Sequence, residues 1–250
     1  MAGALVMPLA GAAVAAEPAP HKLSVGDKLP RFAFLKPGRR SYLRSQLRDG
    51  GYFPVDVWQR EVRFERVDGT ERLRIIQRWD GGGKDPTRVD RDSLLEMGTF
   101  RPLTHIRITR SLDKTVTEGF RFGDKSLIGI RDLAENTRAD LDLPFPEPMY
   151  NFETDMEMLQ TLPLARDYAV SIPFFHPVGG APARYIWRVA TEDTLRGPDG
   201  SGIACWVVET NYNRPGGAPA RFWLTKTTQQ LIKNEATAPD GTIHRKTLLF

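Results

Sequence analysis

The sequence contains a single cysteine among its 250 residues, so no disulfide bond can form within the chain. Cys205 lies in the apolar run "IACWVVE", which favours a small buried hydrophobic residue over a catalytic thiol. Histidine is also scarce. None of the four histidines has a second His or Cys close by in the sequence, which is the spacing that a metal site needs. We therefore expect no metal ion and no other cofactor.

The chain also lacks a strong excess of charge of either sign. Its 35 Lys and Arg residues against 31 Asp and Glu residues give a net charge of +4 and a pI near 9.3. The arginines are scattered through the predicted strands and no nucleic-acid-binding motif is present, so we expect no nucleic-acid partner. The hydrophobic content of 40% is ordinary for a globular protein, and the length suits one large β domain or two small ones.

A long apolar segment that could cross a membrane is missing as well. Residues 1–16, "MAGALVMPLAGAAVAA", are apolar but shorter than the roughly twenty residues that a spanning helix requires. Small residues at positions 13–15, or equally 14–16, suit signal peptidase, although no Lys or Arg precedes the apolar stretch. No cysteine lies near this leader to carry a lipid anchor. We expect an exported, periplasmic protein with no transmembrane segment in the mature chain.

Alternation of apolar and polar side chains predicts strands after the leader. In "DVWQREVRFERVDGTERLRIIQRWDG", Trp58, Val62 and Phe64 alternate with polar residues, as in a strand with one covered face. Asp68 and Gly69 then supply the turn of a hairpin, and the apolar face continues on the return strand.

Further strands are expected on both sides of a Pro-rich break. A second β-ribbon is predicted over residues 104–130, whereas residues 132–149, ending "DLPFPEPMY", cannot continue a sheet. From residue 183 onward, short apolar runs separated by Gly, Pro and Asp turns predict an antiparallel meander. Within it, "RFWLTKTTQQLIKNE" (221–235) is predicted to be a hairpin that turns at its Thr-Thr-Gln-Gln tract.

One helix is predicted, in "NFETDMEMLQTLPLARDY". Asn151 or Thr154 can cap its start, acidic residues occupy its first turn, and Pro163 stops it. Its apolar side must pack against another part of the protein.

These elements predict a mainly β fold. A long antiparallel sheet must curl or close, and the helix would protect its concave face. We expect an open half-barrel over residues 39–250, after the leader and an extended segment over residues 17–38. Two stacked sandwich sheets are the alternative.

No catalytic motif stands out, and we expect no catalytic residues. Ser201 in "GPDGSGIA" has the wrong spacing for a nucleophile turn, and "GGGKDPT" (81–87) lacks the second half of a phosphate-binding loop. His105 and His244 are expected on solvated sheet faces. Most of the carboxylates are expected to face water, namely Asp56, Glu61, Glu65, Glu118, Asp155, Glu157 and Glu209.

Aromatic residues on the predicted strands are the richer signal. They can fill a core under the curved sheet, or part of the concave face can stay open and bind an apolar ligand such as an acyl chain. The candidate ligand-binding residues are Trp58, Phe64, Trp79, Phe120, Phe122, Trp187 and Phe222.

The order of these elements resembles a known family. The hairpin "DVWQREVRFERVDGTERLRIIQRWDG" and the stretches "SLLEMGTFRPLTHIRIT" and "DMEMLQTLPLARDYAVSIPFF" resemble the periplasmic family called domain of unknown function 3108. The closing segment from "YIWRVATEDTL" to "IHRKTLL", with Trp223 to Lys233 inside it, is similar to the C-terminal half of that family. The resemblance implies kinship with the carriers and receptors of bacterial lipoproteins, which hold helices over an open β half-barrel. This chain has one helix candidate where those carriers have more.

We therefore expect a non-catalytic periplasmic protein whose concave face binds an apolar or amphipathic ligand, such as a lipid or a lipoprotein acyl chain, or an envelope partner. One alternative is an envelope interaction module without a small ligand, which contacts anionic lipid or another protein at the membrane periphery. Another is a hydrolase whose acid/base pair assembles only in space.

Overall fold

The computed structural model describes residues 19–81, 86–177, 179–214 and 216–249. The predicted leader over residues 1–16 and most of the Gly-rich connection after Gly81 lie outside the described residues. In the described part, sixteen strands form one sheet, and helical structure is confined to three short pieces. These are the 3-10 helices η1 (Phe32–Phe34) and η2 (Phe152–Thr154) and the helix α1 (Asp155–Leu159).

The strands fall into two series along the chain. The first series is β1 (His21–Lys22), β2 (Gly38–Arg48), β3 (Gly51–Val67), β4 (Thr70–Asp80), β5 (Arg88–Glu96), β6 (Pro102–Arg110), β7 (Thr115–Phe122), β8 (Ser126–Gly129) and β9 (Asp142–Pro144). The second is β10 (Tyr150–Asn151), β11 (Ala169–Phe175), β12 (Ala183–Arg196), β13 (Gly202–Thr210), β14 (Ala220–Thr225), β15 (Leu231–Thr237) and β16 (Ile243–Leu248).

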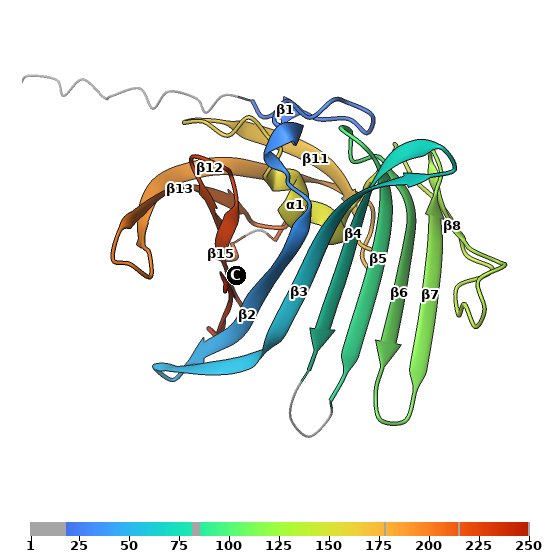
Figure 1. Ribbon diagram of the computed structural model, residues 1–250, viewed down its shortest axis with the longest axis horizontal. Coiled ribbons are helices and arrows are strands. Elements are labelled where there is room, and N and C mark those ends of the chain that lie inside the picture. The colour runs from blue at the N-terminus through green and yellow to red at the C-terminus, as the bar shows by residue number, and fades with distance from the viewer. Residues whose placement is uncertain (1–18, 82–85, 178, 215, 250) are drawn as a thin grey trace, which may run out of the picture.

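The sheet is long, curved and open. Its strand order is β1-β11-β12-β13-β14-β15-β16-β2-β3-β4-β5-β6-β7-β8-β9, with β10 beside β11. The last strand, β16, therefore joins the two halves by pairing with β2. The sheet curves around α1, which lies on its concave side (Figure 1). The predicted fold, a mainly β open sheet with one short helix on the concave face, is confirmed.

Irregularities in strand pairing contribute to the curvature. Register shifts place one extra residue in each of four strands, at Val55, Leu103, Ala190 and Ile232. Such bulges bend a strand and increase its twist. The meander is antiparallel, as predicted, while the short strands β1 and β10 pair with β11 in parallel.

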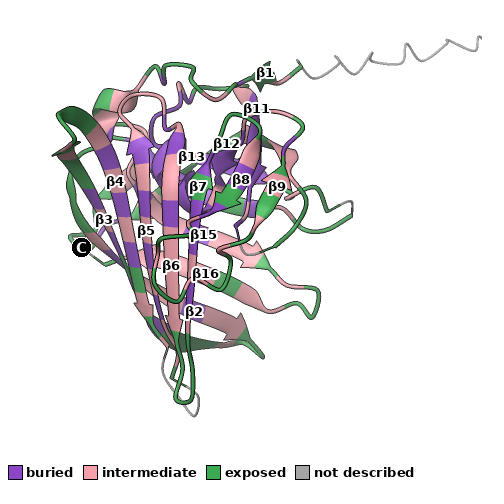
Figure 2. Ribbon diagram, turned by 90° about the vertical axis from the view of Figure 1, so that its right-hand side faces the viewer, coloured by how far each residue is buried: buried purple, intermediate pink, exposed green. Residues whose placement is uncertain are grey.

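The β3–β4 hairpin forms where the sequence predicts it. Val67 pairs with Thr70, and the two residues between them, Asp68 and Gly69, have φ angles of 47° and 76°. Two left-handed residues match the twist of a tight hairpin, which is why Asp-Gly is favoured there. Along β3, β4 and β5 buried residues alternate with more exposed ones (Figure 2).

The main apolar core lies between the concave face and α1. Trp58, Trp187, Phe222 and Met156 belong to this core. The segment before β2 also packs on it, since Leu23, Leu29 and Leu35 are buried there. A second cluster lies at β7 and β8 and contains Phe120, Phe122, Leu127, Phe145, Met149 and Phe175.

Two predictions need correction. The Pro-rich segment 132–149 does contribute a strand, because Asp142–Pro144 pairs with β8. Proline is tolerated at the edge of a sheet, where its missing N–H leaves no internal ladder bond broken. The predicted helix is shorter than its pattern suggests, since only Asp155–Leu159 is α-helical.

Candidate functional site

The register of β2 to β7 aligns concave-face side chains in rows across the sheet, because directly opposite residues of antiparallel strands share a face. One row, here the aromatic row, consists of Tyr42, Trp58, Trp79, Val89, Thr109 and Val116. The adjacent row, here the polar row, consists of Arg40, Arg60, Gln77, Arg91, Arg107 and Glu118. The row beyond it contains Val62, Ile75, Ser93, His105 and Phe120.

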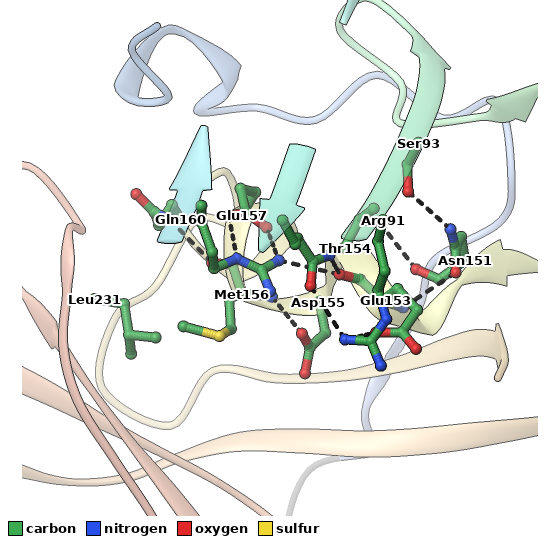
Figure 3. Close-up of polar contacts among 12 residues, drawn as sticks. Arg91, Ser93, Asn151, Glu153, Thr154, Asp155, Met156, Glu157, Gln160 and Leu231 are labelled. Carbon is green, nitrogen blue, oxygen red and sulfur yellow. Dashed lines mark hydrogen bonds and ion pairs between the residues drawn. The ribbon is translucent and has the colours of Figure 1, made fainter. Parts of the chain in front are cut away.

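The polar row meets η2 and α1 through buried ionic contacts (Figure 3). The guanidinium of Arg60 donates to Glu157 Oε1 at 2.7 Å, to Glu157 Oε2, and to the backbone oxygen of Glu153 at 3.0 Å. Gln77 Nε2 donates to the same backbone oxygen at 2.6 Å. A five-residue helix is too short to be stable alone, so these bonds to the sheet help to hold it in place.

Glu153 is the second buried carboxylate of this contact. Arg91 Nη1 lies 3.1 Å from its Oε2, and His176 Nε2 lies 3.5 Å from its Oε1. Burial alone would raise the pKa of Glu153, but the positive charge of Arg91 and its neighbours outweighs burial and lowers it. Glu153 therefore stays ionised inside the protein.

A chain of hydrogen bonds continues from the start of η2 into the sheet. Asn151 Oδ1 accepts from the backbone N–H of Glu153, which caps η2, and Asn151 Nδ2 donates to Ser93 Oγ at 3.2 Å. Ser93 Oγ lies 2.9 Å from His105 Nδ1. Burial lowers the pKa of His105 to about 4, so the ring is neutral at physiological pH. Ser93 and His105 are both completely buried, so no substrate reaches the Ser93 oxygen in this conformation.

The far end of the helical segment is held by the β14–β15 hairpin. Gln229, buried and in a left-handed conformation with φ 54°, donates through Nε2 to the backbone oxygens of Gln160 and Leu162, both at 2.8 Å. Its Oε1 accepts from Arg31. The Thr-Thr-Gln-Gln tract is thus the predicted turn and also a clamp on the end of α1.

Each tryptophan of the aromatic row has two cations close to its ring. Arg60 and Lys246 lie 4.4 and 4.7 Å from the Trp58 ring centroid. Arg44 and Arg91 lie 4.5 and 4.1 Å from that of Trp79. The two rings are in edge contact at 5.7 Å. We call this group the cation–tryptophan cluster: Arg44, Trp58, Arg60, Trp79, Arg91 and Lys246. Cation–π contacts gain strength when water is excluded.

One member of this cluster, Lys246, and its neighbour Asp155 have shifted pKa values. Burial raises the pKa of Asp155 to about 6, against the opposing effect of Arg60 and Lys246. Burial also lowers the pKa of Lys246 to about 8, against the effect of Asp155. Burial therefore disfavours the charged form of both groups.

The members of the cluster differ in exposure, from partly exposed residues at one end to buried residues beneath the helix at the other. The side chain of Arg44 is 27% exposed and contacts Asp56, and Trp79 is half-buried. Arg60 is only 2% exposed, beneath α1. The cluster is thus partly accessible at Arg44 and Trp79 and shielded from water at Arg60.

The structure divides the predicted binding residues among three places. Four of them belong to the main core or pack against it: Trp58, Trp79, Trp187 and Phe222. The ring centroids of Trp187 and Phe222 are 5.1 Å apart. Phe120 and Phe122 lie in the second cluster. Phe64 is 39% exposed at the rim, where it stacks on Phe32. Of these residues, Trp58 and Trp79 lie in the cation–tryptophan cluster.

Several side chains expected to face water are buried. His105 is completely buried, whereas His244 is exposed as predicted. Asp56, Asp155 and Glu157 are also buried, Asp56 because it lies on the concave face and the other two because the helix turns them toward the sheet. The other predicted carboxylates are half-buried, and each pairs with an arginine; they are Glu61, Glu65, Glu118 and Glu209.

The cations of the cluster were not predicted, although the sequence carries a signal for them. In "VWQREVRF", Arg60 stands between Trp58 and Val62 in the alternation that marks the covered face. Arg91 likewise stands two residues after Val89 and two before Ser93. A charge at a covered position of a strand indicates a buried partner or a ligand.

Within the described residues, no group of three or more His, Cys, Asp or Glu side chains is arranged to hold a metal ion. Among those residues there is likewise no helix with the length and apolar character needed to cross a membrane.

The chain matches one protein family over most of its length and is similar to solved structures at low sequence identity. A family described as "Protein of unknown function (DUF3108)" matches residues 42–247. No curated protein matches the chain. One similar solved structure is a beta-barrel-like protein of domain of unknown function DUF1849 from Brucella abortus, with 13% identity, a TM-score of 0.49, and coverage of 85% of this chain and 95% of that chain. Another is a DUF1329 family protein from Desulfovibrio piger, with 10% identity, a TM-score of 0.33, and coverage of 84% and 82%.

Proposed function

We propose that this chain, which belongs to the DUF3108 family of proteins of unknown function, is an exported, non-catalytic protein that binds an amphipathic ligand on the concave face of its sheet. The ligand class includes lipids and the acyl chains of lipoproteins. The leader over residues 1–16 supports export to the periplasm.

The observation that carries this proposal is the cation–tryptophan cluster on the concave face, which is partly exposed at Arg44 and Trp79. Aromatic faces and the aliphatic stems of Lys and Arg accept apolar groups. The cationic ends of the same side chains attract a polar or anionic group. A surface with both properties suits a ligand that is apolar at one end and polar at the other.

The other functions receive less support from the same surfaces. The outer-face arginines Arg74, Arg78 and Arg88 are each paired with carboxylates, which leaves less free charge for an anionic membrane. The Ser93–His105 contact has the residue types of a hydrolase, but both side chains are buried.

The test is to purify the protein from the periplasm without detergent and examine it by native mass spectrometry and lipid extraction. We expect a bound amphiphile in the wild-type protein, and its loss in a folded Trp79→Ala variant. Trp206→Ala is the matched control, because Trp206 is also half-buried and has Lys226 4.3 Å from its ring, but lies on β13. A protein that carries no amphiphile and binds neither dodecanol nor dodecanoate in titrations would refute the proposal.

A further inference from the structure

Arg107 differs from the other members of the polar row. Arg40 donates to Gln230, Arg60 and Arg91 pair with glutamates of the helical segment, Gln77 donates to the Glu153 backbone, and Glu118 pairs with Arg138. Arg107 has a buried Nε that, within the described part of the chain, has no hydrogen-bond partner. A buried, unpaired guanidinium donor costs free energy unless an acceptor is supplied.

Arg107 lies directly opposite another cation on one side and opposite Glu118, which pairs with Arg138, on the other. It pairs in register with Arg91 across β5 and β6, so the two side chains leave the same face of neighbouring strands. Like charges in such positions repel each other. Glu153 contacts Arg91, while Arg91 Nε is itself buried and without an acceptor. Two adjacent guanidinium groups therefore offer unused donors.

The excess of positive charge lowers the pKa values of neighbouring groups. Burial is the main cause that lowers the pKa of Arg91 to about 10, and Glu153 opposes it, but the nearby charge of Arg107 lowers the value further. Burial likewise lowers the pKa of His176, and the charges of Arg91 and Arg107 add to that effect. An anion placed here would relieve repulsion as well as supply acceptors.

We infer that Arg91 and Arg107 hold the oxyanion head group, a carboxylate or a phosphate, of the amphiphile whose apolar part lies along the aromatic row. This inference rests on the proposed function. Guanidinium groups suit oxyanions because their donors form parallel, charge-assisted bonds. The aromatic row lies two residues along each strand, about 7 Å away. A head group on the arginine pair thus places the first methylene groups over Trp79 and Val89, which are opposite each other in that row.

The experiment compares Arg107→Gln with Arg110→Gln. Both changes remove one positive charge from β6, but Arg110 lies on the outer face, where it contacts Asp90. Binding of dodecanoate, dodecyl phosphate, dodecanol and inorganic phosphate is measured by calorimetry on the folded wild-type and variant proteins. We expect Arg107→Gln to weaken binding of both anionic amphiphiles by about tenfold or more. Dodecanol binding stays unchanged, and Arg110→Gln changes nothing.

Thermal unfolding provides a second readout. Arg107 Nε gives up no hydrogen bond within the described residues, and the change removes the repulsion from Arg91. We therefore expect Arg107→Gln to melt at the same temperature as the wild-type protein or higher. A clear fall in melting temperature would show that Arg107 has a structural partner, and would overturn the inference.

The series of ligands distinguishes a failure of the head-group assignment from a failure of the proposed function. If dodecanol binds as tightly as dodecanoate and Arg107→Gln affects neither, the head-group assignment is wrong and the proposed function stands. If inorganic phosphate binds the arginine pair as tightly as dodecyl phosphate, the site takes a free ion and the assignment to an amphiphile is wrong. If no amphiphile binds, the proposed function fails and the inference fails with it.

Discussion

The two faces of strands β3 to β6 use arginine in opposite ways. On the outer face, the side chain of Arg74 is 26% exposed and pairs with Glu65 at 2.6 Å and Asp92 at 2.7 Å. On the concave face, the side chain of Arg60 is 2% exposed and pairs with Glu157 of the helix. The partner is a carboxylate in both cases, but only one of the two pairs is shielded from water.

This difference decides what each pair does. An exposed pair typically contributes about 0.2–1 kcal/mol, because water and salt screen it. A buried pair contributes little net stability relative to an apolar pair, but it becomes very costly when one partner is removed. The outer pairs therefore contribute little to stability, whereas the inner pairs fix where the helix lies. Buried charged side chains on the concave face that lack hydrogen-bond partners are then the best indicators of ligand binding.

The largest expected effect is the loss of the inner pair. Arg60→Met leaves Glu157 buried and unpaired, so we expect the free energy of unfolding to fall by about 3–5 kcal/mol. Arg74→Met on the outer face is the matched control and should cost less than about 1 kcal/mol. Urea denaturation of both variants measures the difference.

A double variant sharpens this comparison. Arg60→Met combined with Glu157→Leu replaces the buried pair by apolar groups, and we expect it to recover much of the lost stability. If Arg60→Met and Arg74→Met had equal costs, the distinction between the two faces would be wrong.

The next effect concerns the inner carboxylate Asp155. Its pKa is raised from 3.8 to about 6 by burial, so the folded protein binds a proton that the unfolded chain has already lost between these pH values. Its favourable contribution is therefore complete below about pH 4 and is lost as the pH rises through 6. Asp155→Asn keeps the acceptor for the Met156 N–H, which Asp155 Oδ1 binds at 2.7 Å.

We expect Asp155→Asn to be more stable than the wild-type protein at pH 8, by up to about 3 kcal/mol. The difference should shrink as the pH falls from 6 to 4. Urea denaturation at pH 4, 6 and 8 measures it. A variant that is less stable at pH 8 would mean that the Asp155 charge is compensated in the folded protein.

Most of the fold could be predicted from the sequence because it follows from local chemistry. Alternation across Trp58 and Val62 identifies a strand with one covered face, and Asp68-Gly69 identifies its turn. The open, curved sheet follows from strand number and connection length. The family resemblance, now confirmed over residues 42–247, pointed to the same architecture.

The site was harder to predict because it depends on register between distant segments. No short-range sequence pattern predicts that Arg60 contacts Glu157, which lies 97 residues away, or that Arg91 lies opposite Arg107. The acidic residues of "NFETDMEM" are typical of a solvated first helical turn, and only the helix orientation reveals that they point into the sheet. Trp58 and Trp79 lie on the concave face, and their role in ligand binding stays a prediction. Their cationic neighbours could be identified only from the strand register.

The smallest expected effect belongs to the outer face, with a pH dependence of the opposite sign to that of Asp155. Asp90 contacts Arg78, Arg88 and Arg110, and its side chain is 21% exposed. Burial would raise its pKa, but the bonds from Arg78 and Arg88 outweigh burial and lower it below 3.8. Its contribution is therefore present above about pH 4 and is lost on acidification.

We expect Asp90→Asn to lower the free energy of unfolding by less than about 1 kcal/mol at pH 7. This loss should be smaller still in 0.5 M salt, because the distance over which charges interact is then roughly a third of that in dilute buffer. Urea denaturation at two salt concentrations and two pH values measures both trends. If Asp90→Asn and Asp155→Asn changed stability in the same direction at pH 8, burial would not be what separates the two faces.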